Sequence, residues 1–148
     1  KQVVLSGEDS EINYAIEQFE KISSRTKCIK LNVSGAFHSP LMKFARETLA
    51  MNINSLSFND PKIPVFQNIN AEPTKDSKKI KENLILQLEN PVQWYSTINN
   101  MIKYLKSNKF IECGPNTVLT GINRKISTDI ETINTDTINK LNDIWTKN

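Results

Sequence analysis

The sequence has 148 residues, of which 38% are hydrophobic and 24% charged, a composition typical of a folded domain and not of a disordered chain. Its formal net charge is +3, and the basic residues are scattered rather than interleaved with aromatic ones, so we expect no nucleic-acid partner. All apolar runs are much shorter than the roughly 20 residues of a membrane span, so we expect no membrane partner either.

The two cysteines, Cys28 and Cys113, lie in apolar runs that resemble strands. We expect them to be small, reduced core residues rather than a disulfide. Two cysteines and a single histidine are also too few to predict a structural zinc site.

The first 33 residues predict a β-α-β unit. Strands are expected over Gln2–Ser6 and Lys27–Val33. Between them, apolar residues recur three and four positions apart and predict one face of a helix: Ile12, Ala15, Ile16, Phe19 and Ile22. The helix is long enough for a crossover, so the two strands are expected to be parallel neighbours in one sheet.

The remainder alternates between helical and strand-like patterns, which predicts an α/β fold. Helices are expected over 40–52, from Asp76 or Ser77 to the Asn90-Pro91 pair, from Pro91 to about 105, and over 118–126. The first of these should bury Leu41 and Phe44, among others. Strands are expected over 63–68 and 109–113, and residues 127–148 are expected to form a tail with an amphipathic helix.

The only histidine, His38, lies on the short connection between the second strand and the helix that follows. Ser39 is expected at the N-cap of that helix and Pro40 at its first position. Connections of this kind are where α/β enzymes place reactive groups, so His38 is a candidate general base. The alternative is that it is an ordinary surface or packing residue.

A histidine base needs a nucleophile to activate. The strand-to-helix signature of such a nucleophile, Gly-x-Ser-x-Gly, does not occur in this sequence. Ser34 and Ser39 flank the histidine, but neither lies in that pattern, and an N-cap role accounts for Ser39. We therefore expect neither serine to be the nucleophile.

Three sequence patches are distinctive: Gln2–Gly7, the histidine motif Gly35–Met42, and Gln87–Trp94 followed by Glu112–Gly121. In this order they resemble the malonyl-CoA:acyl carrier protein transacylases and the related acyltransferase domains of polyketide and fatty acid synthases. Together they extend the resemblance from about Gln2 to Ile126.

The resemblance implies a mechanism. In this family a serine attacks the malonyl thioester while a histidine takes its proton, and the phosphopantetheine thiol of acyl carrier protein then attacks the malonyl-serine ester. His38 matches that histidine, and Gln87 matches a glutamine whose backbone carbonyl orients the imidazole. The substrates would be malonyl-CoA and phosphopantetheinylated acyl carrier protein, with no further cofactor. For Gln87 the alternative is a polar residue on the outer face of its helix.

Two further features follow from the resemblance. Phe37 resembles an aromatic residue of malonyl-selective members, whose ring would crowd an α-branch on the acyl group; the alternative is a core phenylalanine. Lys27, Arg124 and Lys125 are candidates for docking the acidic carrier protein. For these three the alternative is a set of solvated surface charges.

In this family the nucleophilic serine, the arginine that pairs with the malonyl carboxylate and an oxyanion loop all precede the matching segment. We therefore expect the C-terminal part of the enzyme, inactive alone and lacking its N-terminal half as a partner. Residues 1–34 would be part of a ferredoxin-like small subdomain, 35–126 the C-terminal part of an α/β-hydrolase-like acyltransferase core, and 127–148 a tail.

A bacterial cytosol or a plastid stroma would suit such an enzyme. Two alternatives stay open. One is an acyltransferase domain excised from a polyketide synthase, and the other is a non-catalytic module that binds acyl carrier protein or CoA.

Overall fold

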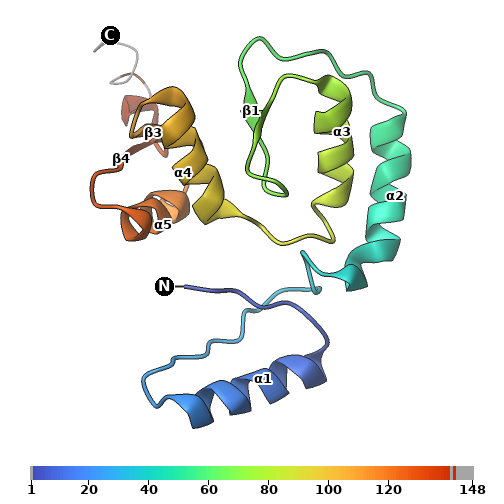
Figure 1. The fold of residues 1–148 in the computed structure, drawn as a ribbon, viewed down its shortest axis with the longest axis vertical. Coiled ribbons are helices and arrows are strands. Elements are labelled where there is room, and N and C mark those ends of the chain that lie inside the picture. The colour runs from blue at the N-terminus through green and yellow to red at the C-terminus, as the bar shows by residue number, and fades with distance from the viewer. Residues whose placement is uncertain (1, 141, 143–148) are drawn as a thin grey trace. The chain divides into compact units, whose positions relative to one another are not determined.

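Short strands and longer helices make up the computed structural model, which describes residues 2–140 and 142 (Figure 1). The chain divides into two compact units, one formed by residues 2–94 and the other beginning at residue 95. Each unit is considered by itself.

The first unit begins with helix α1 (Asp9–Ile22), which confirms the first predicted helix. The Glu11 carboxylate accepts a hydrogen bond from the Glu8 N–H at 3.4 Å, the backward half of a capping box. The two flanking strands were predicted wrongly. Gln2–Ser6 and Lys27–Val33 are not strands, because a strand needs a hydrogen-bonded neighbour and the described residues form sheets only between β1 and β2 and between β3 and β4. Their apolar side chains are exposed, Val3 at 77% and Ile29 at 67%.

Two helices pack side by side in the same unit. After a 3₁₀ turn, η1 (Pro40–Met42), helix α2 (Lys43–Asn54) runs beside α3 (Ser77–Leu86) (Figure 1). The Lys81 Nζ on α3 donates hydrogen bonds at 3.0 Å to the carbonyls of Asn54 and Leu56, which satisfies acceptors at the end of α2.

The prediction for α2 is confirmed in its extent and wrong in part of its inner face. Leu41 and Phe44 were expected to be buried but are exposed, Phe44 at 82%. Helical spacing identifies a possible apolar face, but burial also requires a neighbour that covers it. The described residues do not cover this part of the face.

A short antiparallel pair, β1 (Val65–Phe66) and β2 (Pro73–Thr74), completes the first unit. The strand predicted over 63–68 is reduced to two residues because Pro64 lacks an N–H and the chain turns after Phe66. The turn is closed by a hydrogen bond from the Ala71 N–H to the Gln67 carbonyl at 3.0 Å. The Gln67 side chain then joins this turn to α3, donating to the Ile80 carbonyl and accepting from Asn83.

The second unit contains a parallel β-α-β arrangement. Helix α4 (Trp94–Leu105) leads to β3 (Lys109–Glu112), and α5 (Val118–Ile126) connects β3 to β4 (Glu131–Asn134). The two strands are parallel, with Lys109 opposite Glu131 and Glu112 opposite Asn134. Ile98 on α4 is almost fully buried.

Strand β4 corrects the expectation of a helical tail. The spacing of Ile133 and Ile138 favoured a helix, but the open edge of β3 offers residues 131–134 a ladder of backbone hydrogen bonds. Residues 138–140 are helical, and the rest of the predicted tail helix, at 141 and 143–148, lies outside the described residues. Cys113 is exposed and not a core residue; both cysteines are free thiols.

Among the described residues, no helix combines the length and the apolar character needed to cross a membrane.

Candidate functional site

His38 has an unusual backbone conformation, with a φ of 63° that falls in the left-handed region. Residues other than glycine rarely adopt this region, and they do so where surrounding contacts enforce it. One such contact is the hydrogen bond that the His38 N–H donates to the Leu88 carbonyl at 2.9 Å. The connection before α2 is thus fastened to the segment that follows α3.

The imidazole of His38 is held by the same segment. Its Nδ1 lies 2.9 Å from the Gln87 carbonyl oxygen and 3.1 Å from that of Asn90. Carbonyl oxygens only accept hydrogen bonds, so in the neutral ring Nδ1 carries the proton and Nε2 carries the lone pair. The ring is therefore fixed in the tautomer in which Nε2 accepts a proton.

The carbonyls of Gln87 and Asn90 can accept from the His38 ring because α3 ends just before them, at Leu86. The last carbonyls of a helix have no partner within the helix, and residues 87–90 continue the chain directly after Leu86. The Asn90 side chain stabilises this ending by donating to the Leu86 carbonyl at 2.8 Å. Pro91 then disfavours the helical conformation at Asn90, where the chain bends away from the helix.

The structure thus brings together His38 and Gln87, the pair that the sequence singled out, and adds Asn90. The Gln87 contact is made by its backbone, as expected, so its side-chain type does not create it. The contact with Asn90 was missed. The Asn-Pro pair was used only as a helix stop, although the same pair indicates a carbonyl directed away from the helix axis.

The two serines beside the histidine differ. Ser39 occupies the N-cap of η1 with Pro40 after it, which confirms their predicted positions. Its hydroxyl does not cap the helix but donates to the Ala36 carbonyl at 2.7 Å, and the residue is buried. Ser34 is exposed. That neither is a nucleophile stays a prediction.

The remaining candidates lie on the surface. Phe37 is 42% exposed among the described residues. Lys27 is exposed in the first unit. Arg124 and Lys125 are exposed in the last turn of α5 in the second unit, where cations interact favourably with the helix dipole.

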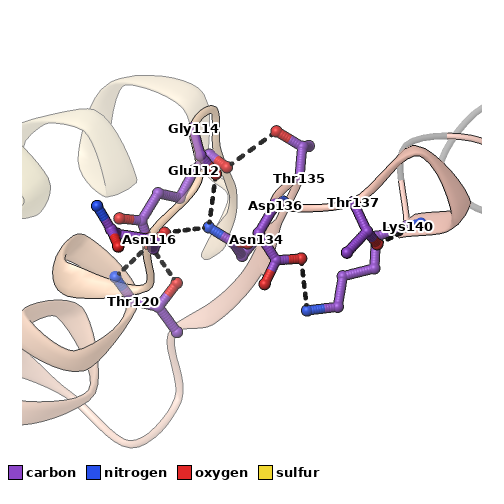
Figure 2. Close-up of polar contacts among 9 residues, drawn as sticks. All are labelled: Glu112, Gly114, Asn116, Thr120, Asn134, Thr135, Asp136, Thr137 and Lys140. Carbon is purple, nitrogen blue, oxygen red and sulfur yellow. Dashed lines mark hydrogen bonds and ion pairs between the residues drawn. The ribbon is translucent and has the colours of Figure 1, made fainter.

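A polar cluster in the second unit was not predicted (Figure 2). The buried Glu112, the last residue of β3, accepts hydrogen bonds from the N–H groups of Leu119 at 2.9 Å and Thr120 at 2.8 Å, and from the Thr120 hydroxyl at 2.5 Å. Burial alone would raise the pKa of this carboxyl, but these hydrogen bonds outweigh it and hold the pKa below its usual range.

The same cluster fixes the loop between β3 and α5. The Asn134 amide donates to the carbonyls of Gly114 and Asn116, and the Thr135 hydroxyl donates to the Glu112 carbonyl at 3.3 Å (Figure 2). The Thr135 N–H donates to the same carbonyl at 3.0 Å. Gly114 has a φ of 142°, a conformation that side chains disfavour. Within the described residues, His, Cys, Asp and Glu side chains form no group of three that could hold a metal ion.

Known proteins resemble the chain along nearly its whole length, although no protein-family model matches it. The malonyl CoA-acyl carrier protein transacylase of Staphylococcus aureus is 35% identical over 147 residues, which cover 99% of this chain and 47% of that protein. The polyketide biosynthesis malonyl CoA-acyl carrier protein transacylase of Bacillus subtilis is 37% identical over 131 residues, covering 88% of this chain and 44% of that protein.

The fold agrees with these sequence matches. The structure of this chain matches a chain in the solved complex of a type II polyketide synthase acyl-carrier protein with its malonyl-transacylase, with a TM-score of 0.87 and 27% sequence identity. The match covers 96% of this chain and 45% of the solved one. Over the part that it spans, the chain matches the malonyl-CoA:acyl carrier protein transacylases in sequence and in fold. It spans about half the length of these transacylases.

This similarity to transacylases gives the histidine site a chemical context. The mixed α/β fold corresponds to part of a transacylase structure. The roles of His38, Gln87, Phe37 and the three basic residues within a transacylase are argued next.

Proposed function

We propose that this chain contributes the general base to an [acyl-carrier-protein] S-malonyltransferase. The enzyme would move a malonyl group from CoA to the phosphopantetheine thiol of acyl carrier protein through a malonyl-serine ester. One observation carries the proposal: His38 Nδ1 donates to the carbonyls of Gln87 and Asn90, which leaves the lone pair on Nε2.

The tautomer determines what the ring can do. In the first half-reaction Nε2 takes the proton of a serine hydroxyl as the serine oxygen attacks the thioester carbonyl, and then returns that proton to the departing CoA sulfur. In the second, Nε2 takes the proton of the phosphopantetheine thiol as its sulfur attacks the ester, and returns it to the departing serine oxygen. Throughout, the proton stays on Nδ1 and remains hydrogen-bonded to the two carbonyls.

Neutral carbonyls perform the orienting task that a carboxylate performs in a Ser-His-Asp triad. They fix the ring and its tautomer without placing a full negative charge beside it. Because both acceptors belong to the backbone, the arrangement depends on how α3 ends rather than on the Gln87 side chain.

The nucleophilic serine would come from the part of the transacylase that this chain does not span. We assign residues 1–34 to a partial small subdomain and 35–126 to the C-terminal part of the acyltransferase core. The segments Gln2–Ser6 and Lys27–Val33 support this, since they have the composition of strands, carry exposed apolar side chains and belong to neither sheet of the described residues. Without the nucleophile, this chain alone would transfer no malonyl group.

Acyl carrier protein is the proposed partner. The polyketide transacylase of the solved complex binds its carrier protein. In this chain, Arg124 and Lys125 at the end of α5, and Lys27, would meet an acidic carrier protein. Phe37 would favour malonyl over α-branched acyl groups, because its exposed ring lies next to His38 in the chain.

The test is to express the complete reading frame that encodes this chain and to measure malonyl transfer from malonyl-CoA to phosphopantetheinylated acyl carrier protein. We expect a Gly-x-Ser-x-Gly serine in the product, transfer activity, and loss of transfer in His38→Ala. A complete product that binds malonyl-CoA without turnover would replace the enzyme by a non-catalytic binding module.

A polyketide role is the second candidate, because the Bacillus subtilis relative is a polyketide transacylase. Parallel assays with fatty acid and polyketide carrier proteins separate the two. The preferred carrier protein, judged by kcat/KM, identifies the pathway class.

A further inference from the structure

An unusually close and sheltered ion pair lies beside the histidine site. The Nε of Arg46 on α2 lies 2.6 Å from an Oε of Glu89, which follows α3. Their side chains are only 24% and 20% exposed, whereas those of the Lys30–Asp9 pair are 57% and 85% exposed. Water therefore screens the Arg46–Glu89 attraction much less than that of an ordinary surface pair.

Glu89 stands among the groups that hold His38. The Leu88 carbonyl on one side accepts the His38 N–H, and the Asn90 carbonyl on the other accepts from the ring. Two backbone bonds of this segment are longer than the usual value of about 2.9–3.0 Å: 3.2 Å from the Glu89 N–H to the Leu86 carbonyl and 3.4 Å from the Asn90 N–H to the Gln87 carbonyl. An attachment through the Glu89 side chain would therefore add to the hold on these carbonyls.

Arg46 provides this attachment from α2, the helix that follows His38 in the chain. It lies in the first turn of α2, the helix into which the His38 connection leads. The pair thus joins the element that carries the imidazole to the segment that carries its acceptors.

Building on the proposed function, we propose that Arg46 and Glu89 are positioning residues for the general base. Their ion pair holds the carbonyls of residues 87–90 against the imidazole and so keeps the proton on Nδ1. Removing Arg46 takes this partner from the sheltered Glu89, and removing Glu89 leaves Arg46 only its longer contact with the exposed Glu47; either change loosens the segment. The ring then loses its acceptors, and the Nε2–H tautomer, which cannot act as base at Nε2, becomes populated.

Glu47 provides a matched control. Its carboxylate lies 3.6 Å from Nη2 of the same arginine, but Glu47 belongs to α2 and not to the segment that holds the ring. Glu47→Gln therefore removes an equal charge beside Arg46 without detaching residues 87–90.

The tautomer can be read directly because the chain has a single histidine. With ¹⁵N-labelled histidine and a pH at which the ring is neutral, long-range ¹H–¹⁵N spectra distinguish Nδ1–H from Nε2–H. We expect Nδ1–H in the wild type, Glu47→Gln and Arg46→Lys. In Glu89→Gln and Arg46→Gln the Nε2–H fraction should rise by about tenfold, as for a locally opened segment.

An unchanged tautomer in folded Glu89→Gln and Arg46→Gln overturns the positioning role while leaving the proposed function intact. An Nε2–H tautomer in the wild type overturns instead the assignment of His38 as the base.

A second measurement applies if these variants do not fold in the isolated chain. In the enzyme made from the complete reading frame, Glu89→Gln should lower kcat and leave the KM for malonyl-CoA unchanged. Glu47→Gln should change neither. An equal loss of kcat in both variants overturns the proposal.

Discussion

Thr120 donates to the Glu112 carboxylate through both its N–H, at 2.8 Å, and its hydroxyl, at 2.5 Å. Glu112 thereby caps α5 from outside the helix, because the N–H groups of Leu119 and Thr120 belong to its unsatisfied first turn. Thr117, at the N-cap itself, makes no side-chain cap hydrogen bond. A strand residue thus stabilises the helix that connects the two parallel strands.

Glu112→Gln should therefore destabilise the protein, with a fall in Tm of about 2–5 °C. The effect should depend on pH. Hydrogen bonding holds the pKa of Glu112 below its ordinary value, so its stabilisation is complete above the unfolded pKa and is lost as pH falls through the folded pKa. Thermal unfolding at pH 7 and in steps below pH 4.5 should show wild type and variant converging as the pH falls. A gap that stays constant with pH would refute this account.

The N-cap of α3 is a second local test. The Asp76 carboxylate accepts from the N–H groups of Lys78 at 2.9 Å and Lys79 at 3.3 Å. Asp76→Ala should reduce the free energy of unfolding by about 1 kcal/mol, measured by denaturant titration. Thr117→Ala is the matched control, since Thr117 is an N-cap residue without such a bond, and it should cost much less.

The helices were largely predictable because their signals are local. Apolar spacing and the helix-start signals at Asp76 and at Ser39-Pro40 predicted α1, α2, α3 and α5, and the resemblance of short motifs indicated His38 and Gln87. Strands depend on partners, and this explains the errors. Gln2–Ser6 and Lys27–Val33 have strand composition without a ladder, whereas residues 131–134 form β4 because β3 lies open beside them.

Long-range polar contacts were the other gap. Nothing in the sequence pairs Glu112 with Thr120, or Arg46 with Glu89, since each pair depends on how two elements meet. The contact between the His38 ring and the Asn90 carbonyl was easier to predict, because Pro91 disfavours a helical conformation at Asn90.

Because backbone carbonyls orient the His38 ring, two variants of the complete enzyme should differ in kcat. Gln87→Ala keeps the carbonyl that accepts from Nδ1 and should change kcat by about twofold or less. His38→Ala removes the base and should lower kcat by about 10²–10⁴-fold. Steady-state transfer assays measure both. A loss in Gln87→Ala as large as that in His38→Ala would mean that the Gln87 side chain itself takes part.

The proposed role of Phe37 in excluding α-branched acyl groups can be tested by measuring acyl selectivity. If its exposed ring crowds an α-branch, Phe37→Ala should raise kcat/KM for methylmalonyl-CoA relative to malonyl-CoA by about tenfold or more, within the 1–3 kcal/mol that one methyl group is worth. Competition assays with both thioesters measure the ratio. Phe44→Ala is the control, since Phe44 is an exposed phenylalanine on α2, and its ratio should equal that of the wild type. Equal ratios in all three proteins would remove Phe37 from the acyl site.

Reversing a positive charge at the end of α5 tests whether this surface docks the carrier protein. Arg124→Glu in the complete enzyme should raise the KM for acyl carrier protein several-fold at low salt, because rim charges act mainly on encounter with an oppositely charged partner. Hydrolysis of malonyl-CoA in the absence of carrier protein should not change, since that reaction does not use the docking surface. The difference should shrink as salt is added. Lys79→Glu, the same reversal at an exposed lysine of α3, is the control and should leave the KM unchanged. If Arg124→Glu and Lys79→Glu raise the KM equally, the effect comes from net charge, and Arg124 has no specific place in docking.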